Sequence, residues 1–375
     1  MNQYLSKSIH FLDTSEIRKV FDLASKIENP INLSIGQPDF PVPENIKEAI
    51  KKALTDNFTS YTPTQGLLQL REALSVQWKE RDNIEIHPDD IMISAGVASL
   101  LYLLFDVFFD EGDTILLVDP YFLIYEALSK YHRLNIVYIN EDFTEDDLDA
   151  LSEKTKTSRI KAAFYSTPSN PSGKILSKEQ LQALANFSRK TGTLLISDEI
   201  YRDFDYDNKF TSTACFCPEN TITLGGFSKS HAMTGLRIGY MGVPENLRDI
   251  LKKTAALQQY SIVCSPQPMQ WGALEAVKTS MAKEIALMKK RRDIVSESLN
   301  NITPYSQPDG AFYLFAQTPF DGSEFVKRAI EKKLLIVPGF IFSQNKNTVR
   351  ISYAQKEDLL REGLAIFSDL IKNGA

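Results

Sequence analysis

The sequence of 375 residues has few of the residues that bind metals or form disulfides. Its three cysteines are Cys215, Cys217 and Cys264, and the C-x-C pair lacks a second pair that would complete a zinc site. The four histidines are scattered without the spacing of metal ligands. We therefore expect no metal site and interpret the cysteines as core thiols.

Long apolar runs and an excess of basic residues are absent as well. Residues 1–24 carry charges in every turn, so they lack the apolar core of a signal peptide. No later run approaches the roughly 18 apolar residues of a membrane span. A net charge of −6 offers nothing to attract nucleic acid or an anionic membrane surface. The sequence predicts a cytoplasmic protein that binds neither membranes nor nucleic acid and acts on small molecules.

The chain has no internal repeat and no linker rich in Gly, Ser or Pro, so we expect one folded unit with lobes. From about residue 90, short apolar runs alternate with helical patterns, which indicates an α/β fold with a mainly parallel sheet between helices. A long amphipathic helix at 281–300 then leads into the strands and final helix of a smaller α+β domain. The predicted units are an N-terminal segment (1–45) that packs with the small domain through a helix at 15–27, a large domain (46–285) and a small domain (286–375).

Ligands of such sheets bind beyond the carboxyl ends of the strands. One of these ends carries Lys229, which follows Gly225, Gly226 and Ser228. A lone lysine is usually a solvated surface residue. However, a desolvated lysine near other cations loses its proton more easily, and the neutral amine forms a Schiff base with an aldehyde. Arg237, eight residues on, offers a planar fork of donors that suits a phosphate. Together they predict pyridoxal phosphate as cofactor.

That cofactor makes further demands on the chain. Its pyridine nitrogen needs a carboxylate partner, which Asp198 in "SDEIY" supplies, although Asp198 could instead cap a helix. Tyr201, one helical turn later, and Asn170 in "NPSG" could donate to the phenolic oxygen of the cofactor. Phe122 could stack on its ring, or could equally be core packing. Its phosphate needs backbone N–H groups at a helix start, which we expect at Gly96, Val97 and Ala98.

These residues lie in motifs that occur in a known order. The chain resembles, from end to end, the class I/II aminotransferases of PLP (pyridoxal phosphate) fold type I, in particular the prokaryotic aspartate/aromatic group. The motifs that carry the resemblance are "SEIRKVFDLA", "NLSIGQPDFPVP", "YTPTQGLLQLREAL", "NPSG", "SDEIY", "FSKSHAMTGLRIGY", "GAFY" and "VRISYA". It implies a large domain with a mainly parallel seven-stranded sheet, plus a smaller α+β domain.

The resemblance implies roles for the cofactor site. Lys229 would hold the cofactor covalently and then move the substrate proton, Asp198 would bind the pyridinium, and Tyr201 with Asn170 would bind the phenolate. Arg237, the turn at 96–98 and Ser228 would bind the phosphate.

The resemblance also implies how substrate and a second subunit bind. Arg350 would bind the α-carboxylate of the substrate through two hydrogen bonds, supported by Gly36 and Asn170. Tyr61 would reach the phosphate in the neighbouring subunit, which implies a homodimer with shared active sites.

Two positions depart from the family pattern. Gly226 stands where many members have a phosphate-binding serine, and the "AGVAS" turn lacks the lysine of some aspartate-preferring relatives. Gly226 leaves the exact phosphate ligands open, and the "AGVAS" turn lowers the expectation of a strict aspartate donor, so aspartate, an aromatic or another neutral amino acid remains a candidate donor.

The predicted function is a ping-pong transfer of an amino group between an L-amino acid and a 2-oxo acid, with glutamate/2-oxoglutarate as one pair. Three alternatives remain open. The same scaffold supports carbon–sulfur β-lyases and related fold type I enzymes. A ligand-sensing domain of a transcription regulator would need a further DNA-binding domain, for which we expect no room because the resemblance begins near residue 9. A protein that binds a phosphate ligand without a covalent lysine is the third.

Overall fold

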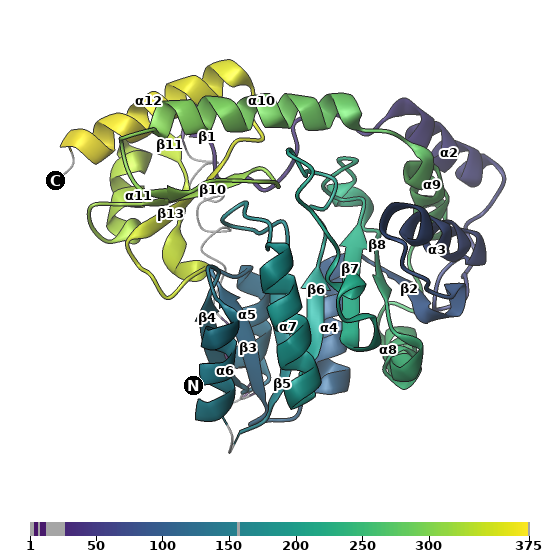
Figure 1. The fold of residues 1–375 in the computed structure, drawn as a ribbon. Coiled ribbons are helices and arrows are strands. Elements are labelled where there is room, and N and C mark those ends of the chain that lie inside the picture. The colour runs from purple at the N-terminus through teal and green to yellow at the C-terminus, as the bar shows by residue number, and fades with distance from the viewer. Residues whose placement is uncertain (1–3, 7, 13–26, 156–157, 374–375) are drawn as a thin grey trace.

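The computed structural model describes residues 4–6, 8–12, 27–155 and 158–373. The helix predicted at 15–27 lies almost entirely in the stretch 13–26, outside the described residues. Figure 1 shows a large domain and a small domain, with the long helix α10 (Ala282–Leu299) running from one to the other. This helix confirms the long helix predicted at 281–300, but its buried face is not purely apolar, because it includes Arg291 and Arg292.

The large domain is built on a seven-stranded sheet with the order β2-β8-β7-β6-β5-β3-β4. Neighbours pair in parallel except at β8, which runs antiparallel to both β2 and β7. The mainly parallel seven-stranded sheet is therefore confirmed. The strands are β2 (Ile91–Ser94), β3 (Thr114–Asp119), β4 (Asn135–Asn140), β5 (Ile160–Ser166), β6 (Leu194–Asp198), β7 (Thr221–Gly226) and β8 (Gly239–Gly242).

Helices cover both faces of this sheet (Figure 1). In β3, Ile115 and Leu117 pack with α4 (Val97–Phe108), α5 (Leu123–Tyr131) and α8 (Arg248–Ser261). Leu116 and Val118 face the other way, toward α6 (Glu145–Lys154) and α7 (Lys178–Thr191). Because both faces are buried, a central strand such as β3 has a continuous apolar run instead of an alternating pattern. A third cluster joins α3 (Leu68–Asp82) and α9 (Gln267–Lys278) to β2, and α2 (Glu44–Thr55) packs on α9.

Local sequence explains where several helices begin and end. Thr144 and Asp147 form reciprocal capping hydrogen bonds at the start of α6, and Ser177 and Gln180 do the same for α7. α7 ends at Gly192, whose left-handed backbone costs little without a Cβ.

The small domain contains an antiparallel sheet with the order β12-β13-β10-β9. Its strands are β9 (Tyr305–Ser306), β10 (Tyr313–Gln317), β12 (Val337–Pro338) and β13 (Thr348–Ser352). Its last helix, α12 (Glu357–Asn373), packs on α10 and on α11 (Gly322–Glu331). A short N-terminal strand, β1 (Ile31–Asn32), pairs with β11 (Leu334–Leu335) of this domain. The preceding η1 (Ser8–Phe11) contacts α5 of the large domain instead. The proposed boundaries fall inside α2 and α10, and they stay predictions.

Of the cysteines, Cys217 is buried, Cys264 is half-buried and Cys215 is exposed, so the core-thiol interpretation is wrong for Cys215. Among the described residues, no cluster of His, Cys, Asp or Glu could hold a metal ion. No helix in the described part of the chain is long and apolar enough to cross a membrane.

Candidate active site

The carboxyl ends of the parallel strands share one edge of the sheet, where β3, β6 and β7 end at Asp119, Asp198 and Gly226. The antiparallel β8 begins at that same edge, so the connection 227–238 that carries Lys229 and Arg237 lies there too. A cavity of about 220 Å³ opens at this edge. Eleven of the predicted site residues line it: Gly36, Val97, Ala98, Phe122, Asn170, Asp198, Tyr201, Ser228, Lys229, Arg237 and Arg350.

Lys229 projects into the cavity, and its Nζ donates to the carbonyl oxygen of Gly36 at 2.8 Å. Burial is the main cause that lowers the pKa of Lys229 from 10.5 to about 8. The positive charges of Arg350 and Arg237 lower it further, while Asp198 opposes them. The amine is therefore neutral in an appreciable fraction of molecules near neutral pH, as a nucleophile must be.

Asp198 is buried, with 3% of its surface exposed. Burial raises the pKa of its carboxyl to about 6, while hydrogen bonds from the Tyr125 hydroxyl (2.9 Å) and the Ile200 N–H (3.1 Å) act in the opposite direction. The carboxylate forms no ion pair with another described residue. A buried carboxylate in this state is stabilised by a cation placed against it.

The helix α4 begins at this edge with its N-terminal N–H groups directed at the cavity rim. Its N-cap is Gly96 at φ 83°, and Val97 and Ala98 of its first turn line the cavity. The guanidinium of Arg237 donates to the carbonyl oxygens of Ala95 (3.1 Å) and Thr234 (2.9 Å). Arg237 itself has a left-handed backbone, with φ 57°, of the kind that concentrates at functional positions. A helix start beside a guanidinium suits an anion.

Arg350 reaches the cavity from β13 of the small domain. Its guanidinium donates to Asn170 Oδ1 (3.0 Å) and to the carbonyl oxygen of Ser34 (2.7 Å). It lies between two aromatic rings, those of Tyr313 and Phe342, 4.6 and 4.7 Å from the ring centres. Its Nε is buried and has no partner among the described residues. Burial lowers the pKa of Arg350, so an anionic partner would be favourable.

Two predicted site residues do not line this cavity. Gly96 lies behind it, where a Cβ would meet the guanidinium of Arg237. Tyr61 is 82% exposed on the loop before α3. The end of α8 lies against this loop, because Gln258 donates to the Thr64 carbonyl oxygen, and α8 carries a second exposed tyrosine, Tyr260 (87%).

Sequence reasoning assigned no role to two tyrosines of the site. Tyr125 bonds to Asp198, and the hydroxyl of Tyr313 lies 2.8 Å from that of Tyr201. Tyr125 follows Phe122 by about one turn at the start of α5, which was a usable signal. Tyr313 stands in the "GAFY" motif, but its place beside Arg350 depends on strand register.

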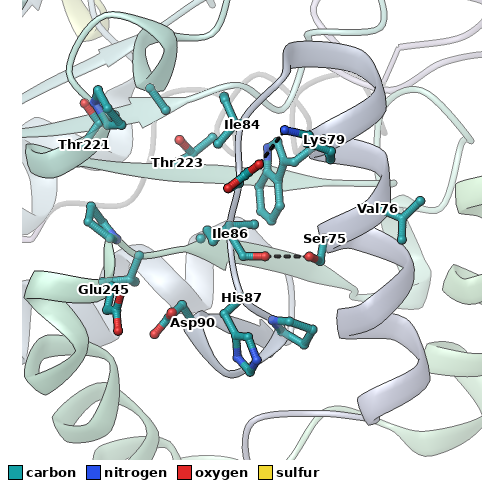
Figure 2. A pocket seen from close by; sticks show the side chains of 18 of the residues that line it. Ser75, Val76, Lys79, Ile84, Ile86, His87, Asp90, Thr221, Thr223 and Glu245 are labelled. Carbon is teal, nitrogen blue, oxygen red and sulfur yellow. Dashed lines mark hydrogen bonds and ion pairs between the residues drawn. The ribbon is translucent and has the colours of Figure 1, made fainter.

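A larger cavity, of about 750 Å³, lies beneath α3 (Figure 2). It is at the opposite edge of the sheet, where β7 begins at Thr221 and β8 ends at Gly242. Two of its polar side chains have partners within the lining: Ser75 donates to the Ile86 carbonyl oxygen at 2.5 Å, and Lys79 pairs with Glu85 (Figure 2). This position is not where parallel sheets bind ligands.

The residues of the smaller cavity fit pyridoxal phosphate. The buried carboxylate of Asp198 calls for a cation such as a pyridinium N–H. The start of α4 with Arg237 suits a phosphate, and Lys229 offers an amine that loses its proton readily. The unpartnered Nε of Arg350 leaves a donor for a substrate carboxylate.

Comparison with known proteins agrees with this geometry. The family model for "Aminotransferase class I and II" matches residues 28–367. The chain is 35% identical to the "Probable aspartate aminotransferase" of Methanocaldococcus jannaschii, covering 96% of this chain and 97% of that one. It is 34% identical to "Aromatic-amino-acid aminotransferase 2" of Thermococcus litoralis, covering 98% of both.

Among solved structures, the aspartate aminotransferase of Thermus thermophilus with maleate superposes with a TM-score of 0.91 at 29% identity, covering 98% of this chain and all of that one. Family, relatives and fold thus agree. The chain belongs to the class I and II aminotransferases and is a pyridoxal phosphate-dependent enzyme.

Proposed function

We propose that the enzyme transfers an amino group between an L-amino acid and a 2-oxo acid by a ping-pong reaction through Lys229, with glutamate and 2-oxoglutarate as one pair. One observation carries this proposal. An amine with a lowered pKa, a buried carboxylate and two guanidinium groups, from three separate segments, line one cavity.

In this proposal the bound cofactor supplies an electron sink for the carbanion that forms when the α-proton leaves. Asp198 keeps the pyridine nitrogen protonated, and Tyr125 and the Ile200 N–H hold its carboxylate in place. Arg237, Ser228 and the first turn of α4 hold the phosphate, Phe122 covers the ring, and Tyr201 with Asn170 donates to the ring oxygen. These assignments are supported by the common position of the residues around the cavity.

Lys229 has two tasks. Its neutral amine would hold the cofactor, and once released it would take the α-proton from the substrate and return it at the adjacent cofactor carbon. The lowered pKa suits both, because a general base works best when its pKa lies near the operating pH.

Arg350 binds the α-carboxylate of the substrate. The Asn170 side chain and the Ser34 carbonyl fix the orientation of its planar guanidinium. The remaining N–H groups are thereby presented to the two carboxylate oxygens. Gly36 lies at the same end of the cavity and lets the N-terminal segment approach without a side chain.

We further propose a homodimer in the cytoplasm, in which Tyr61 of each subunit completes the phosphate site of the other. The exposed tyrosines at 61 and 260, on adjoining segments, support such an interface, since large aromatic side chains are enriched at the centre of interfaces.

The test is the absorbance spectrum of the purified enzyme with its cofactor, recorded after adding single amino acids and then 2-oxoglutarate. We expect the band of the bound cofactor to fade with one amino acid and to return with the keto acid, which also identifies the donor. Lys229→Ala should keep part of its cofactor affinity and lose turnover; normal turnover in that variant would contradict the proposal.

The same measurement separates transamination from carbon–sulfur lyase chemistry. A lyase needs no amino acceptor, so it would release ammonia and a keto acid from the first substrate without 2-oxoglutarate. That result would replace the proposed reaction, while leaving Lys229 as the site of attachment.

A further inference from the structure

Tyr313 connects two parts of the site that the proposed function treats separately. In the register of β10 with β13, Phe315 lies opposite Arg350. Tyr313 precedes Phe315 by two residues on the same strand, so it shares a sheet face with Phe315 and Arg350. Its ring covers the Arg350 guanidinium at 4.6 Å, and its hydroxyl oxygen lies 2.8 Å from that of Tyr201.

Cofactor binding fixes which of the two tyrosine hydroxyls donates the hydrogen bond and which accepts it. Each tyrosine hydroxyl has one proton to donate. If Tyr201 donates its proton to the ring oxygen of the cofactor, its own oxygen can only accept from Tyr313. The hydrogen bonds then run from Tyr313 to Tyr201 to the cofactor.

On this basis we propose that Tyr313 is a positioning residue: its hydroxyl orients and polarises Tyr201 as the donor to the cofactor, and its ring holds the plane of Arg350 for the substrate carboxylate. The inference rests on the proposed function, because it needs a cofactor oxygen beside Tyr201. One side chain thereby aligns the cofactor and substrate ends of the cavity.

The two parts of Tyr313 act on different measurable quantities. A hydrogen-bond donor stabilises the negative charge on the ring oxygen of the cofactor. This stabilisation is greatest when the nitrogen contributed by Lys229 is neutral, so the donor lowers the pKa of that nitrogen. Chains of hydrogen bonds strengthen one another, so removing the Tyr313 hydroxyl weakens donation by Tyr201. The ring, in contrast, affects the affinity for the substrate carboxylate through its stacking on Arg350.

The experiment is a pH titration of the absorbance of the bound cofactor in holoenzyme variants. We expect Tyr313→Phe to raise the midpoint of this absorbance titration by on the order of 0.5–1 pH unit. Tyr201→Phe should raise the same midpoint by more. The double variant should shift no further than Tyr201→Phe, since Tyr313 acts through Tyr201. Tyr353→Phe is the matched control, because this buried tyrosine of the same domain lies outside the cavity and should leave the midpoint unchanged.

Substrate kinetics test whether the Tyr313 ring supports substrate binding by Arg350. Tyr313→Phe retains the stacked ring and should keep KM for the amino acid within about twofold, whereas Tyr313→Leu should raise KM about tenfold. A wild-type midpoint in Tyr313→Phe, or additive shifts in the double variant, would overturn the inference while leaving the proposed function intact. A wild-type enzyme that shows no band of bound cofactor would instead refute the proposed function itself.

Discussion

Lys229 is held where its charge is disfavoured. Its amine lies in the cavity with two guanidinium groups and a single carboxylate around it. Desolvation and like charges both favour the neutral form of an amine. The residue therefore combines a reactive state with a fixed position, because its amine donates a hydrogen bond to the Gly36 carbonyl oxygen.

This state predicts a distinctive pH dependence of labelling. In the cofactor-free enzyme, a small acylating reagent should modify Lys229 with a midpoint near pH 8, below the ordinary lysine value of 10.5. The sign follows from the lowered pKa, since the neutral fraction reaches one half at a lower pH and only that fraction reacts. Peptide mass spectrometry across a pH series measures this. A midpoint at the ordinary lysine value of 10.5 would contradict the prediction.

Gly36 offers a second test at the residue scale. A Cβ at this position would lie 2.5 Å from the Tyr313 hydroxyl oxygen but 3.5 Å from the next ring atom. Gly36→Ala should therefore displace that hydroxyl and lower kcat/KM about tenfold, a cost typical of overpacking. In the Tyr313→Phe background the clash is gone, so the same substitution should cost less than about twofold. Equal losses in both backgrounds would show that the Tyr313 hydroxyl is not the obstacle.

At the scale of elements, the start of α4 and the β7–β8 connection form the proposed phosphate site. β8 runs antiparallel to β7, which returns the chain to the edge where α4 begins. Gly239, the first residue of β8, has no side chain, and a Cβ there would lie 2.6 Å from the Val97 nitrogen. Close packing of the strand against the helix start therefore brings Arg237 beside the N–H groups of α4.

We expect Gly96→Ala to weaken cofactor affinity about 10- to 100-fold. The substitution strains a backbone at φ 83° and places a methyl group against the guanidinium of Arg237. Gly112→Ala is the matched control, because its φ of 88° imposes a similar strain in open space away from the cavity. Titration of each cofactor-free variant with pyridoxal phosphate measures the affinity. Equal affinities in the two variants would mean that the contact with Arg237 has no effect.

At the scale of the whole molecule, the active site joins both domains. Asp198, Lys229 and Arg237 come from the large domain, while Arg350 comes from the small domain. The Tyr121 N–H donates to the Phe342 carbonyl oxygen at 2.7 Å, so the segment that carries Phe122 is tied to the segment that stacks on Arg350. A change in the angle between domains would therefore alter the distance between cofactor and carboxylate sites.

Mixed dimers test whether Tyr61 completes the site of a second subunit. Lys229→Ala and Tyr61→Ala chains are each expected to be poorly active alone. After mixing and exchange, each mixed dimer should contain one site with both Lys229 and Tyr61, which would restore about a quarter of wild-type activity. No recovery, although mass measurements show mixed dimers, would mean that Tyr61 does not act across the interface.

Much of this arrangement follows from the sequence. The alternation of apolar runs with helical patterns predicted the parallel sheet, because strands buried on both faces must be apolar along their length. Residues that follow these strands, such as Asp198 and Lys229, could then be assigned to one edge. The motif order identified the family, and the family model and the relatives confirmed it.

Only the tertiary structure decided which side chains meet. Tyr313 lies over Arg350 because β10 and β13 pair in one particular register, and a shift by one residue would turn it to the other face. The Tyr125 bond to Asp198 depends on how α5 packs on the sheet through β3 and β4. Local patterns encode the type and limits of each element, whereas register and packing arise from contacts between residues far apart in the chain, which no short motif specifies.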